Sequence, residues 1–370
     1  MTPNRKTMLV LCPFPEGVAA GQRLKYEQYF DDWAKSGFDI DVSPFMDPAF
    51  FRIVYERGHF WKKVWGTLRG HVRRLGDVMR VRRYSVVYVF MYVTPLGTTV
   101  LERMTRRLAR KLIYDVEDNV VGDVDPLVKG HPNSMVRSLR GKGKARFLIQ
   151  TADHVITSAP ALNELCMRIN ERRACTYISS SVDTDRFVPA NPYSNDNVVT
   201  IGWTGTFSSR PFLDLLRPVF QQLAKRRTFK LRVIGNFDYE LPGVDLEVIR
   251  WSVEREVEDL QGIDIGVYPL PVDDWVTGKS GLKAIQYMAF AIPCVATNVG
   301  TTPLIIRHGD NGLLATSDDD WLTGLETLID DPALRRRLGE QARRDAVERY
   351  STKAVAADYR RVIDSVMADR

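Results

Sequence analysis

The sequence holds few residues of the two types that most often cross-link domains or bind metals. Its 370 residues include four cysteines and five histidines. Because the cysteines show no paired or CxxC spacing, they favour a reducing compartment over a disulfide scaffold. The histidines form no HxxxH or HExxH pattern, so we expect no metal site. The cysteines are Cys12, Cys166, Cys175 and Cys294.

Long apolar runs are also missing. No stretch approaches 18 uninterrupted apolar residues, so the sequence predicts no transmembrane helix. The polar, basic residues 1–7 precede an apolar run that is too short for the core of a secretory signal. We therefore expect a soluble or peripheral protein in the cytoplasm.

The composition is that of a globular protein with an uneven charge. Hydrophobic residues make up 44% and charged residues 26%, and the length favours two domains of about 150–200 residues. Residues 1–190 hold 30 Lys and Arg against 20 Asp and Glu, a net charge of +10. The remainder holds 22 against 26, a net charge of −4, and the two sum to +6. This asymmetry suggests two domains with different partners.

The chain begins with a strand, a loop and a helix. Residues 8–11 predict a buried strand, the loop 12–21 is rich in small residues, and 22–35 predict a helix. This order is typical of the opening unit of a doubly wound α/β sheet. The loop contains no G-x-G-x-x-G, so the nicotinamide and flavin fingerprint is absent. Further strands are expected at 38–42, 86–90, 111–114 and 153–158.

A basic amphipathic helix is predicted at 61–84. Tryptophans on its apolar side suit an anionic membrane surface, and the alternative is a helix whose apolar side packs on the sheet. Nucleic acid is a rival partner for the charge, but no motif matches a nucleic-acid reader, so we expect none. The apolar side comprises Trp61, Val64, Trp65, Leu68, Val72, Leu75 and Met79, and the opposite side Lys62, Lys63, Arg69, Arg73, Arg74 and Arg80, followed by Arg82 and Arg83, with Asp77 as the single acid.

Acidic residues follow the strand predicted at 111–114. Asp115 and Asp118 stand where α/β sheets place ligands, at the carboxyl end of a strand. They are candidates to bind acceptor hydroxyls or to act as a base. The alternatives are helix caps and ordinary loop acids.

A polar linker, residues 189–197, precedes a second series of strands and helices. The strand 198–203 leads through the loop 204–209 to a helix at 211–225. Backbone N–H groups of Gly205 and Thr206 in this loop suit an anion. Strands are expected at 229–234, 248–251 and 263–268, and Trp251 is expected in the core, with stacking on a base as the alternative.

The most distinctive segment is 278–297. A small, basic loop precedes a helix with an apolar face and then a short apolar run that reads as a buried parallel strand. Free N–H groups at a helix N-terminus form an anion site, to which Lys279 adds a full charge. The alternative is an ordinary loop, helix and strand of an α/β protein.

This segment resembles the donor site of family 4 glycosyltransferases. That family carries a basic loop, a helix with two glutamates separated by seven residues, and then Pro-x-Val-Ala-Thr. Here Gln286 stands at the second glutamate position, before Tyr-Met-Ala, and Gly278 stands at the first. A branch of the family carries this Gly-Lys and Gln-Tyr-Met-Ala form. The Gln286 amide both donates and accepts hydrogen bonds, so it retains the capacity to hold ribose hydroxyls. Residues 15–29 and 177–187 also resemble family segments.

The resemblance implies the GT-B fold, with two Rossmann-like domains that face an interdomain cleft. The expected domains are 1–188, joined by the last helix 351–370, and 189–350. The nucleotide sugar would contact the second domain, and the loop of the first domain would face the cleft. The implied donor-binding residues are Gly205, Thr206, Lys279, Ser280, Gly281, Lys283 and Gln286, and the implied cleft-loop residues are Gly17, Ala20, Gly21 and Arg23.

The resemblance also implies a reaction. A sugar would pass from a nucleoside diphosphate to a hydroxyl with retention, without metal or cofactor. Lys279 would stabilise the leaving diphosphate, and Asp115 and Asp118 would meet the acceptor. We expect a lipid-linked or cell-surface glycan acceptor, as in bacterial polysaccharide or lipopolysaccharide synthesis, at the inner face of the plasma membrane. A nucleotide-sugar 2-epimerase and a non-catalytic homologue remain alternatives, because Gly278 and Gln286 replace both acids.

Overall fold

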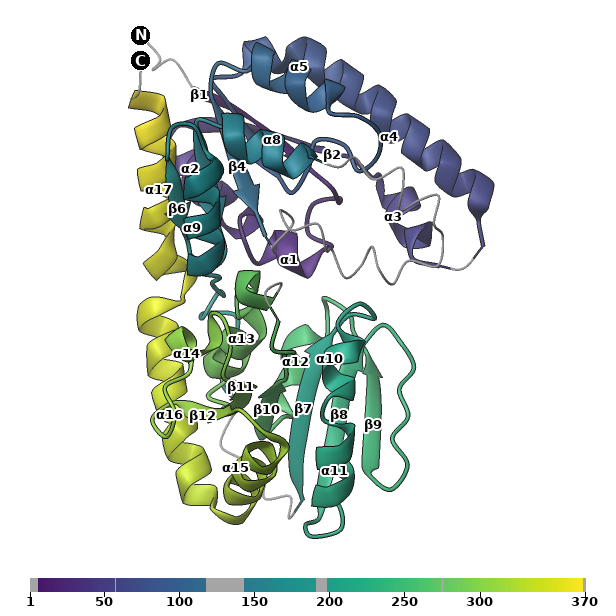
Figure 1. Ribbon diagram of the computed structural model, residues 1–370, viewed down its shortest axis with the longest axis vertical. Coiled ribbons are helices and arrows are strands. Elements are labelled where there is room, and N and C mark those ends of the chain that lie inside the picture. Colours follow the sequence, from purple (N-terminus) through teal and green to yellow (C-terminus); the bar gives the residue numbers. More distant parts are fainter. Residues whose placement is uncertain (1–5, 57, 118–142, 191–197, 274–275, 369–370) are drawn as a thin grey trace. The chain divides into compact units, whose positions relative to one another are not determined.

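The computed structural model describes residues 6–56, 58–117, 143–190, 198–273 and 276–368 (Figure 1). The chain divides into two compact units, Met1–Ser179 with Ala356–Arg370, and Ser180–Val355. Residues 182–187 belong to the second unit because Val182 pairs with Ser351 and because Arg343 donates hydrogen bonds to two carbonyls of this segment. The division therefore falls before the polar linker and not within it.

The first unit is built on a parallel sheet of six strands in the order β2-β1-β3-β4-β5-β6. Its central strands are buried on both faces, which explains why they are short, continuous apolar runs in the sequence. The strands predicted from these runs are confirmed. They are β1 (Lys6–Cys12), β2 (Phe38–Pro44), β3 (Val86–Phe90), β4 (Leu112–Val116) and β5 (His154–Thr157), and β6 (Cys175–Tyr177), which was not predicted, completes the sheet.

Helices flank this sheet, and one predicted helix is broken. The expected helix at 22–35 consists of three pieces, because Lys25 and Tyr26 leave the helical path and turn into the core. The pieces are α1 (Ala20–Arg23), a 3-10 turn (Glu27–Tyr29) and α2 (Phe30–Lys35). The other helices are α3 (Pro48–Val54), α4 (Phe60–Arg80), followed by the 3-10 turn Val81–Arg83, α5 (Val100–Leu108), α8 (Lys144–Thr151), α9 (Pro160–Ile169) and the greater part of α17 (Thr352–Ala368).

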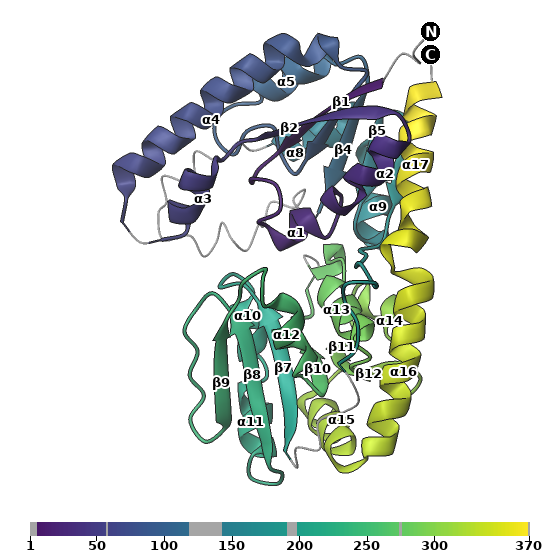
Figure 2. The same cartoon turned by 180° about the vertical axis from the view of Figure 1, so that it is seen from behind.

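The long basic helix α4 is present where expected, but its packing differs from one of the two expectations. Its apolar side does not pack on the sheet: Trp61 and Met79 are each 79% exposed and Trp65 is 61% exposed. The buried side carries Gly66 and Gly70 instead. Both views show α4 beside α5 at one edge of the first unit (Figures 1 and 2).

The second unit repeats the design with the order β12-β11-β10-β7-β8-β9, again all parallel. The helix expected at 211–225 is split, because Pro218 has no N–H to continue the helical ladder and instead starts a new helix. Trp251, expected in the core, is half-buried after an edge strand. The strands are β7 (Val199–Gly205), β8 (Phe229–Gly235), β9 (Asp245–Arg250), β10 (Ile265–Tyr268), β11 (Cys294–Thr297) and β12 (Gly312–Ala315). The helices are α10 (Arg210–Asp214), α11 (Arg217–Leu223), α12 (Glu256–Gln261), α13 (Leu282–Ala289), α14 (Thr302–Ile305), α15 (Asp318–Asp330) and α16 (Pro332–Arg349).

Each sheet has a point at which the strand order reverses. In the first unit β2 lies on one side of β1 and β3 on the other, and in the second unit β8 and β10 flank β7 in the same way. Open α/β sheets bind ligands at the carboxyl ends of the strands beside such a reversal. The loops after β1 and β3, and after β7 and β10, are therefore the places to look for a site. Within the described ranges, no helix is long and apolar enough to cross a membrane.

Candidate functional site

The loop after β7 approaches its neighbours too closely for any residue but glycine at its start. A Cβ on Gly205 would overlap the Trp203 ring and would lie 2.5 Å from Ser209 Oγ. The loop closes on itself, since the Thr206 N–H donates to Ser209 Oγ (3.0 Å) and that hydroxyl donates to the Thr206 carbonyl (3.1 Å). The Thr206 N–H, expected to face an anion, thus serves this turn.

The loop after β10 ends at the N-terminus of α13. Gly281, the N-cap residue, has a φ of +74°, a conformation that favours glycine, and a Cβ there would overlap Ile305. No side chain caps the helix, and its first turn holds no acid. The Thr301 hydroxyl donates to the Lys279 carbonyl (2.6 Å), and the Lys279 N–H donates to the Val276 carbonyl (2.9 Å). The expected Lys279 N–H donor is therefore also engaged within its own loop.

Lys283 brings the two loops together. Its Nζ lies 3.3 Å from Ser209 Oγ and 4.6 Å from the centroid of the Trp203 ring. Lys279 and Lys283 thus stand just before and within the first turn of α13, at the positive end of its dipole. Cations at that end are unfavourable by themselves and become favourable when an anion binds. The arrangement is chemically suited to a phosphate group.

Two neighbouring residues on α13 face inward. Gln286 is buried, and Tyr287 is fully buried. The Tyr287 hydroxyl accepts a hydrogen bond from the Thr204 N–H (3.1 Å) and donates to the Gly202 carbonyl (3.2 Å), so it joins α13 to β7. Burial raises the pKa of Tyr287 well above its ordinary value. Sequence reasoning missed this joint, because a tyrosine in a helix with an apolar face reads only as core.

In the first unit, Asp115 at the end of β4 is fully buried. Its Oδ1 lies 2.6 Å from Lys25 Nζ, and the Tyr88 hydroxyl donates to its other oxygen. Burial raises the pKa of Asp115, and the Lys25 ammonium opposes this shift. A direct contact between this carboxyl and an acceptor would require the ion pair to open. Asp118, the other expected acid, lies outside the described residues.

The loop after β1 is held by its own side chains. Gly17 has a φ of +79°, and its N–H donates to Glu27 Oε2 (2.9 Å). Gln22 Nε2 donates to the Phe14 carbonyl (2.9 Å). Burial raises the pKa of Glu27. Neither Glu27 nor Gln22 was expected to fix this loop. Of the expected loop residues, Ala20, Gly21 and Arg23 lie in α1 and are half-buried.

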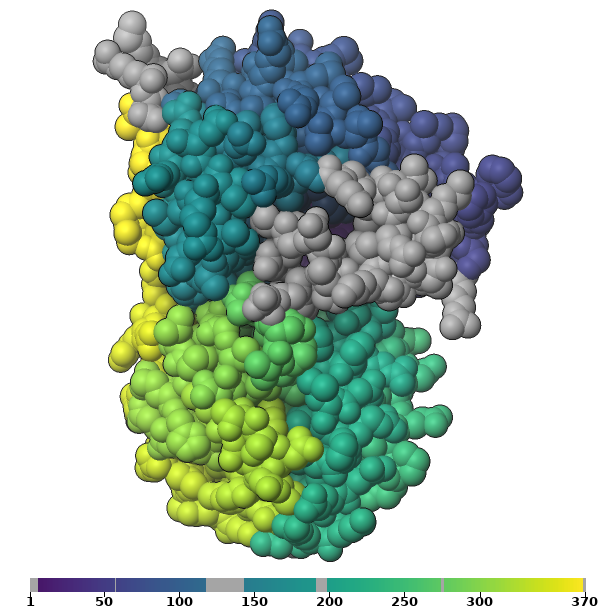
Figure 3. Space-filling model, in the orientation of Figure 1, coloured from purple at the N-terminus to yellow at the C-terminus, as the bar shows by residue number. Residues whose placement is uncertain are grey.

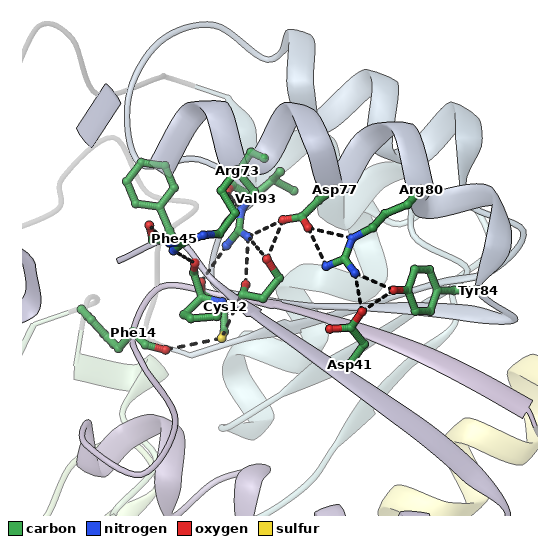
Figure 4. A network of polar contacts seen from close by, with 12 residues as sticks. Cys12, Phe14, Asp41, Phe45, Arg73, Asp77, Arg80, Tyr84 and Val93 are labelled. Carbon is green, nitrogen blue, oxygen red and sulfur yellow. Dashed lines mark hydrogen bonds and ion pairs between the residues drawn. The ribbon is translucent and has the colours of Figure 1, made fainter. Parts of the chain in front are cut away.

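A buried arginine, Arg74, ties α4 to the ends of β1 and β2 and to the loop after β3, and Figure 4 shows Cys12, Asp77 and Val93 of this polar network. Arg74 is fully buried, and its guanidinium donates to the carbonyls of Cys12 (2.7 Å), Ser43 (2.8 Å) and Val93 (2.7 Å). Its Nη1 lies 2.9 Å from Asp77 Oδ2. The sequence prediction that placed Arg74 on a solvated basic side is wrong, because this side faces the sheet. Glycines four and eight residues before Arg74 were the available signal.

The thiol at the end of β1 is inert. Burial raises the pKa of Cys12 to about 12, so the thiolate is scarce near neutral pH. Among the residues that the structure describes, His, Cys, Asp and Glu side chains form no group suited to hold a metal ion.

Residues 198–331 match the sequence family described as Glycosyl transferases group 1. They form a group 1 glycosyltransferase domain. The match covers the loops after β7 and β10 as well as α13. The resemblance to family 4 glycosyltransferases is thereby confirmed for this domain.

Curated relatives match only in part. N-acetyl-alpha-D-glucosaminyl L-malate synthase of Bacillus anthracis is 33% identical over 93 residues, 24% of this chain and 24% of that protein. D-inositol 3-phosphate glycosyltransferase of Corynebacterium kroppenstedtii is 33% identical over 157 residues, 37% of this chain and 34% of that protein. The chain thus matches at most about a third of the length of these relatives.

Solved structures match over nearly the whole chain. Sucrose-phosphate synthase from Thermosynechococcus elongatus aligns over 99% of this chain and 100% of its own, with a TM-score of 0.71 and 15% identity. Anabaena HepE in complex with UDP-glucose aligns over 97% and 99%, with a TM-score of 0.65 and 14% identity. These likenesses confirm the predicted GT-B fold, with the group 1 domain as its second half.

Proposed function

We propose that this protein is a retaining glycosyltransferase. It transfers a sugar from a nucleoside diphosphate to a hydroxyl of a lipid-linked or cell-surface glycan, in bacterial polysaccharide or lipopolysaccharide synthesis. The observation that carries the proposal is the contact of Lys283 with the loop of Gly205 at the N-terminus of α13, which Lys279 precedes in the chain, at the strand reversal of a group 1 domain. HepE, which binds UDP-glucose, and the named glycosyltransferases among the relatives support this class of reaction.

The leaving diphosphate defines the roles of these residues. The bond between the anomeric carbon and the diphosphate oxygen breaks, and negative charge grows on that oxygen. The two lysine ammonium groups and the N–H groups at the start of α13, next to Ser280 and Gly281, stabilise this charge without a metal or another cofactor. Gln286 holds ribose hydroxyls through its amide.

The acceptor side is assigned to the first unit. The acceptor hydroxyl forms the new glycosidic bond and loses its proton. We assign contact with this hydroxyl to Asp115 in β4 or to Asp118 beyond it, and we favour Asp118, because Asp115 is committed to Lys25. Work on a lipid-linked acceptor would place the protein in the cytoplasm, at the inner face of the plasma membrane, where the basic region 61–83 would meet anionic lipids. Nucleic acid has no role in this proposal.

Nucleotide release from a panel of UDP-, GDP- and dTDP-sugars tests the proposal. We expect slow hydrolysis of one donor, and acceleration when a bacterial lipid extract supplies the acceptor. The glycosidic product should keep the anomeric configuration of the donor.

Two other outcomes would replace the proposal. Tight nucleotide binding without turnover would favour a non-catalytic homologue. Gly278 and Gln286, which stand in place of two acids, are consistent with that alternative. Isomerisation of the donor sugar without an acceptor would indicate a 2-epimerase. No nucleotide binding at all would remove the donor site.

A further inference from the structure

The outer side of α4 is an apolar stripe in contact with solvent. Its members recur at spacings of three and four residues, which places them on one side of the helix along its 21 residues, about 30 Å. Single exposed apolar residues are ordinary, but a continuous stripe with two tryptophans indicates a binding surface. The stripe consists of Trp61, Val64, Trp65, Leu68, Val72, Leu75 and Met79, each at least 44% exposed.

The inner side of α4 prevents the stripe from turning inward. Cβ atoms on Gly66 and Gly70 would lie 2.6 Å from the rings of Phe50 and Phe45, respectively, so the helix backbone rests directly on these rings. One turn further on, Arg74 donates hydrogen bonds to the carbonyls of Cys12, Ser43 and Val93. Because these contacts lie opposite the stripe, they hold it outward as a fixed feature of the fold.

The surface extends beyond one helix. Val100 and Met104 of the neighbouring α5 are exposed, and Arg103 and Arg107 of the same helix are exposed beside them. In the space-filling view α4 and α5 form part of the outer surface of the first unit (Figure 3). We call the stripe together with these four residues the α4–α5 face.

The charge along this face is positive. Residues 60–83 contain eight Lys and Arg residues and one acid, Asp77. That acid is buried and joined to Arg74 and Arg80, so it does not offset the exposed cations. Asp47 lies 3.6 Å from Arg69 and offsets that one residue in part. The exposed cations of α4 and the turn after it are Lys62, Arg69, Arg82 and Arg83.

We propose that the α4–α5 face docks on the interfacial zone of an anionic lipid bilayer. The axis of α4 lies parallel to the membrane plane, the stripe enters the boundary between headgroups and acyl chains, and the flanking cations meet lipid phosphates. The docking proposal identifies the residues of the membrane contact that the proposed function includes, and it rests on that function for its biological role. Binding to the bilayer itself requires no turnover.

Charge and shape favour a bilayer over other occupants. A second copy of the chain would set the same cations against each other across a two-fold interface. Nucleic acid would neutralise the cations but would leave the apolar stripe in water. An anionic bilayer satisfies both the stripe and its charged border.

Vesicle binding by the full chain tests the proposal. We expect cosedimentation with vesicles of phosphatidylcholine mixed with phosphatidylglycerol, much weaker binding to pure phosphatidylcholine, and release by high salt. Lipids with brominated acyl chains should quench the fluorescence of Trp61 and Trp65, and the double variant Trp61→Phe/Trp65→Phe should lose most of this quenching.

Matched variants locate the contact. Val72→Glu should weaken binding by about tenfold or more, because it places a carboxylate against anionic lipid. Val347→Glu is the control, since Val347 is also an exposed valine on a helix, α16 of the second unit, and it should leave binding unchanged. Arg82→Gln should weaken binding by about fivefold, the equivalent of about 1 kcal/mol for one cation near the surface.

Other results would overturn the docking proposal without touching the proposed function. These are vesicle binding that Val72→Glu leaves intact, dimerisation that Val72→Glu abolishes, or binding of the face to DNA or an acidic protein in preference to vesicles. Donor hydrolysis without vesicles should be equal in Val72→Glu and the parent. If no donor is hydrolysed while the vesicle results hold, the proposed function fails and the docking surface stands.

Discussion

Both units contain a six-stranded parallel sheet with a reversal of strand order, but the residues at the two reversal points differ in role. In the first unit, Arg74 donates hydrogen bonds to carbonyls at the ends of β1 and β2 and in the loop after β3, and Lys25 pairs with Asp115 of β4. In the second unit, Gly205 lies tightly against Trp203 and Ser209, Gly281 lies tightly against Ile305, and Lys283 at the start of α13 contacts Ser209.

This difference separates rigidity from binding. The N–H groups of Arg74 donate to backbone carbonyls of the protein itself, so this residue has a structural role. In the second unit the first turn of α13 holds no acid, and Lys279 and Lys283 stand just before and within that turn. A similar strand arrangement therefore yields a firm support for α4 in one unit and an anion cradle in the other.

Breaking the hydrogen bonds of Arg74 in the first unit should have the largest effect. Arg74→Met removes the guanidinium hydrogen bonds to three buried carbonyls and the ion pair with Asp77, which keeps Ser43 and Arg80 as partners, so the free energy of unfolding should fall by about 3–5 kcal/mol. Urea unfolding followed by circular dichroism measures this loss. Arg82→Met, at an exposed arginine of the next turn, should change it by less than about 0.5 kcal/mol. Equal losses of unfolding free energy in the two variants would show that the hydrogen bonds of Arg74 do not stabilise the first unit.

Breaking the cradle of the second unit should affect turnover and leave stability unchanged. Lys279→Ala removes one full charge from the position of the leaving diphosphate, so turnover of the accepted donor should fall by about 10²–10³-fold. Steady-state kinetics of nucleotide release measures the change. Lys225→Ala, at an exposed lysine near the end of α11, should keep the parent rate. Near-normal turnover in Lys279→Ala would remove this lysine from the proposed phosphate site.

Substitutions at two glycines of α4 should have the smallest effects on stability, and they test how closely α4 packs in the first unit. Gly70→Ala gains helix propensity but drives a Cβ against the Phe45 ring, a clash that typically costs about 1–3 kcal/mol, so we expect a net loss of stability. Gly76 has no neighbour within 4 Å of its Cβ position, so Gly76→Ala should stabilise the protein by about 0.5–1 kcal/mol. Thermal unfolding compares the two, and shifts of the same sign would contradict the close packing of α4 on Phe45.

The strands and the cationic segment were predictable because both have local signals. Buried parallel strands are short apolar runs, and the segment 278–297 shows a glycine-bearing loop before a periodic helix. The side of α4 that packs was not predictable by apolarity, because here glycines and an arginine face the protein. The pairing of Lys25 with Asp115 joins residues 90 positions apart, and no local pattern indicates such a contact.

The first unit is assembled from the two ends of the chain, and this has a consequence during synthesis. Tyr359 of α17 packs 4.7 Å from Tyr29 and 5.9 Å from Trp33, as measured between ring centroids. The ribosome makes residues 180–355 between these partners, which takes roughly ten to thirty-five seconds at about 5–20 residues per second. During that interval Tyr359 has not yet been synthesised, so the aromatic residues around Trp33 lack their contact with α17. The second unit can therefore finish folding before the first unit, although most of the first unit is translated earlier.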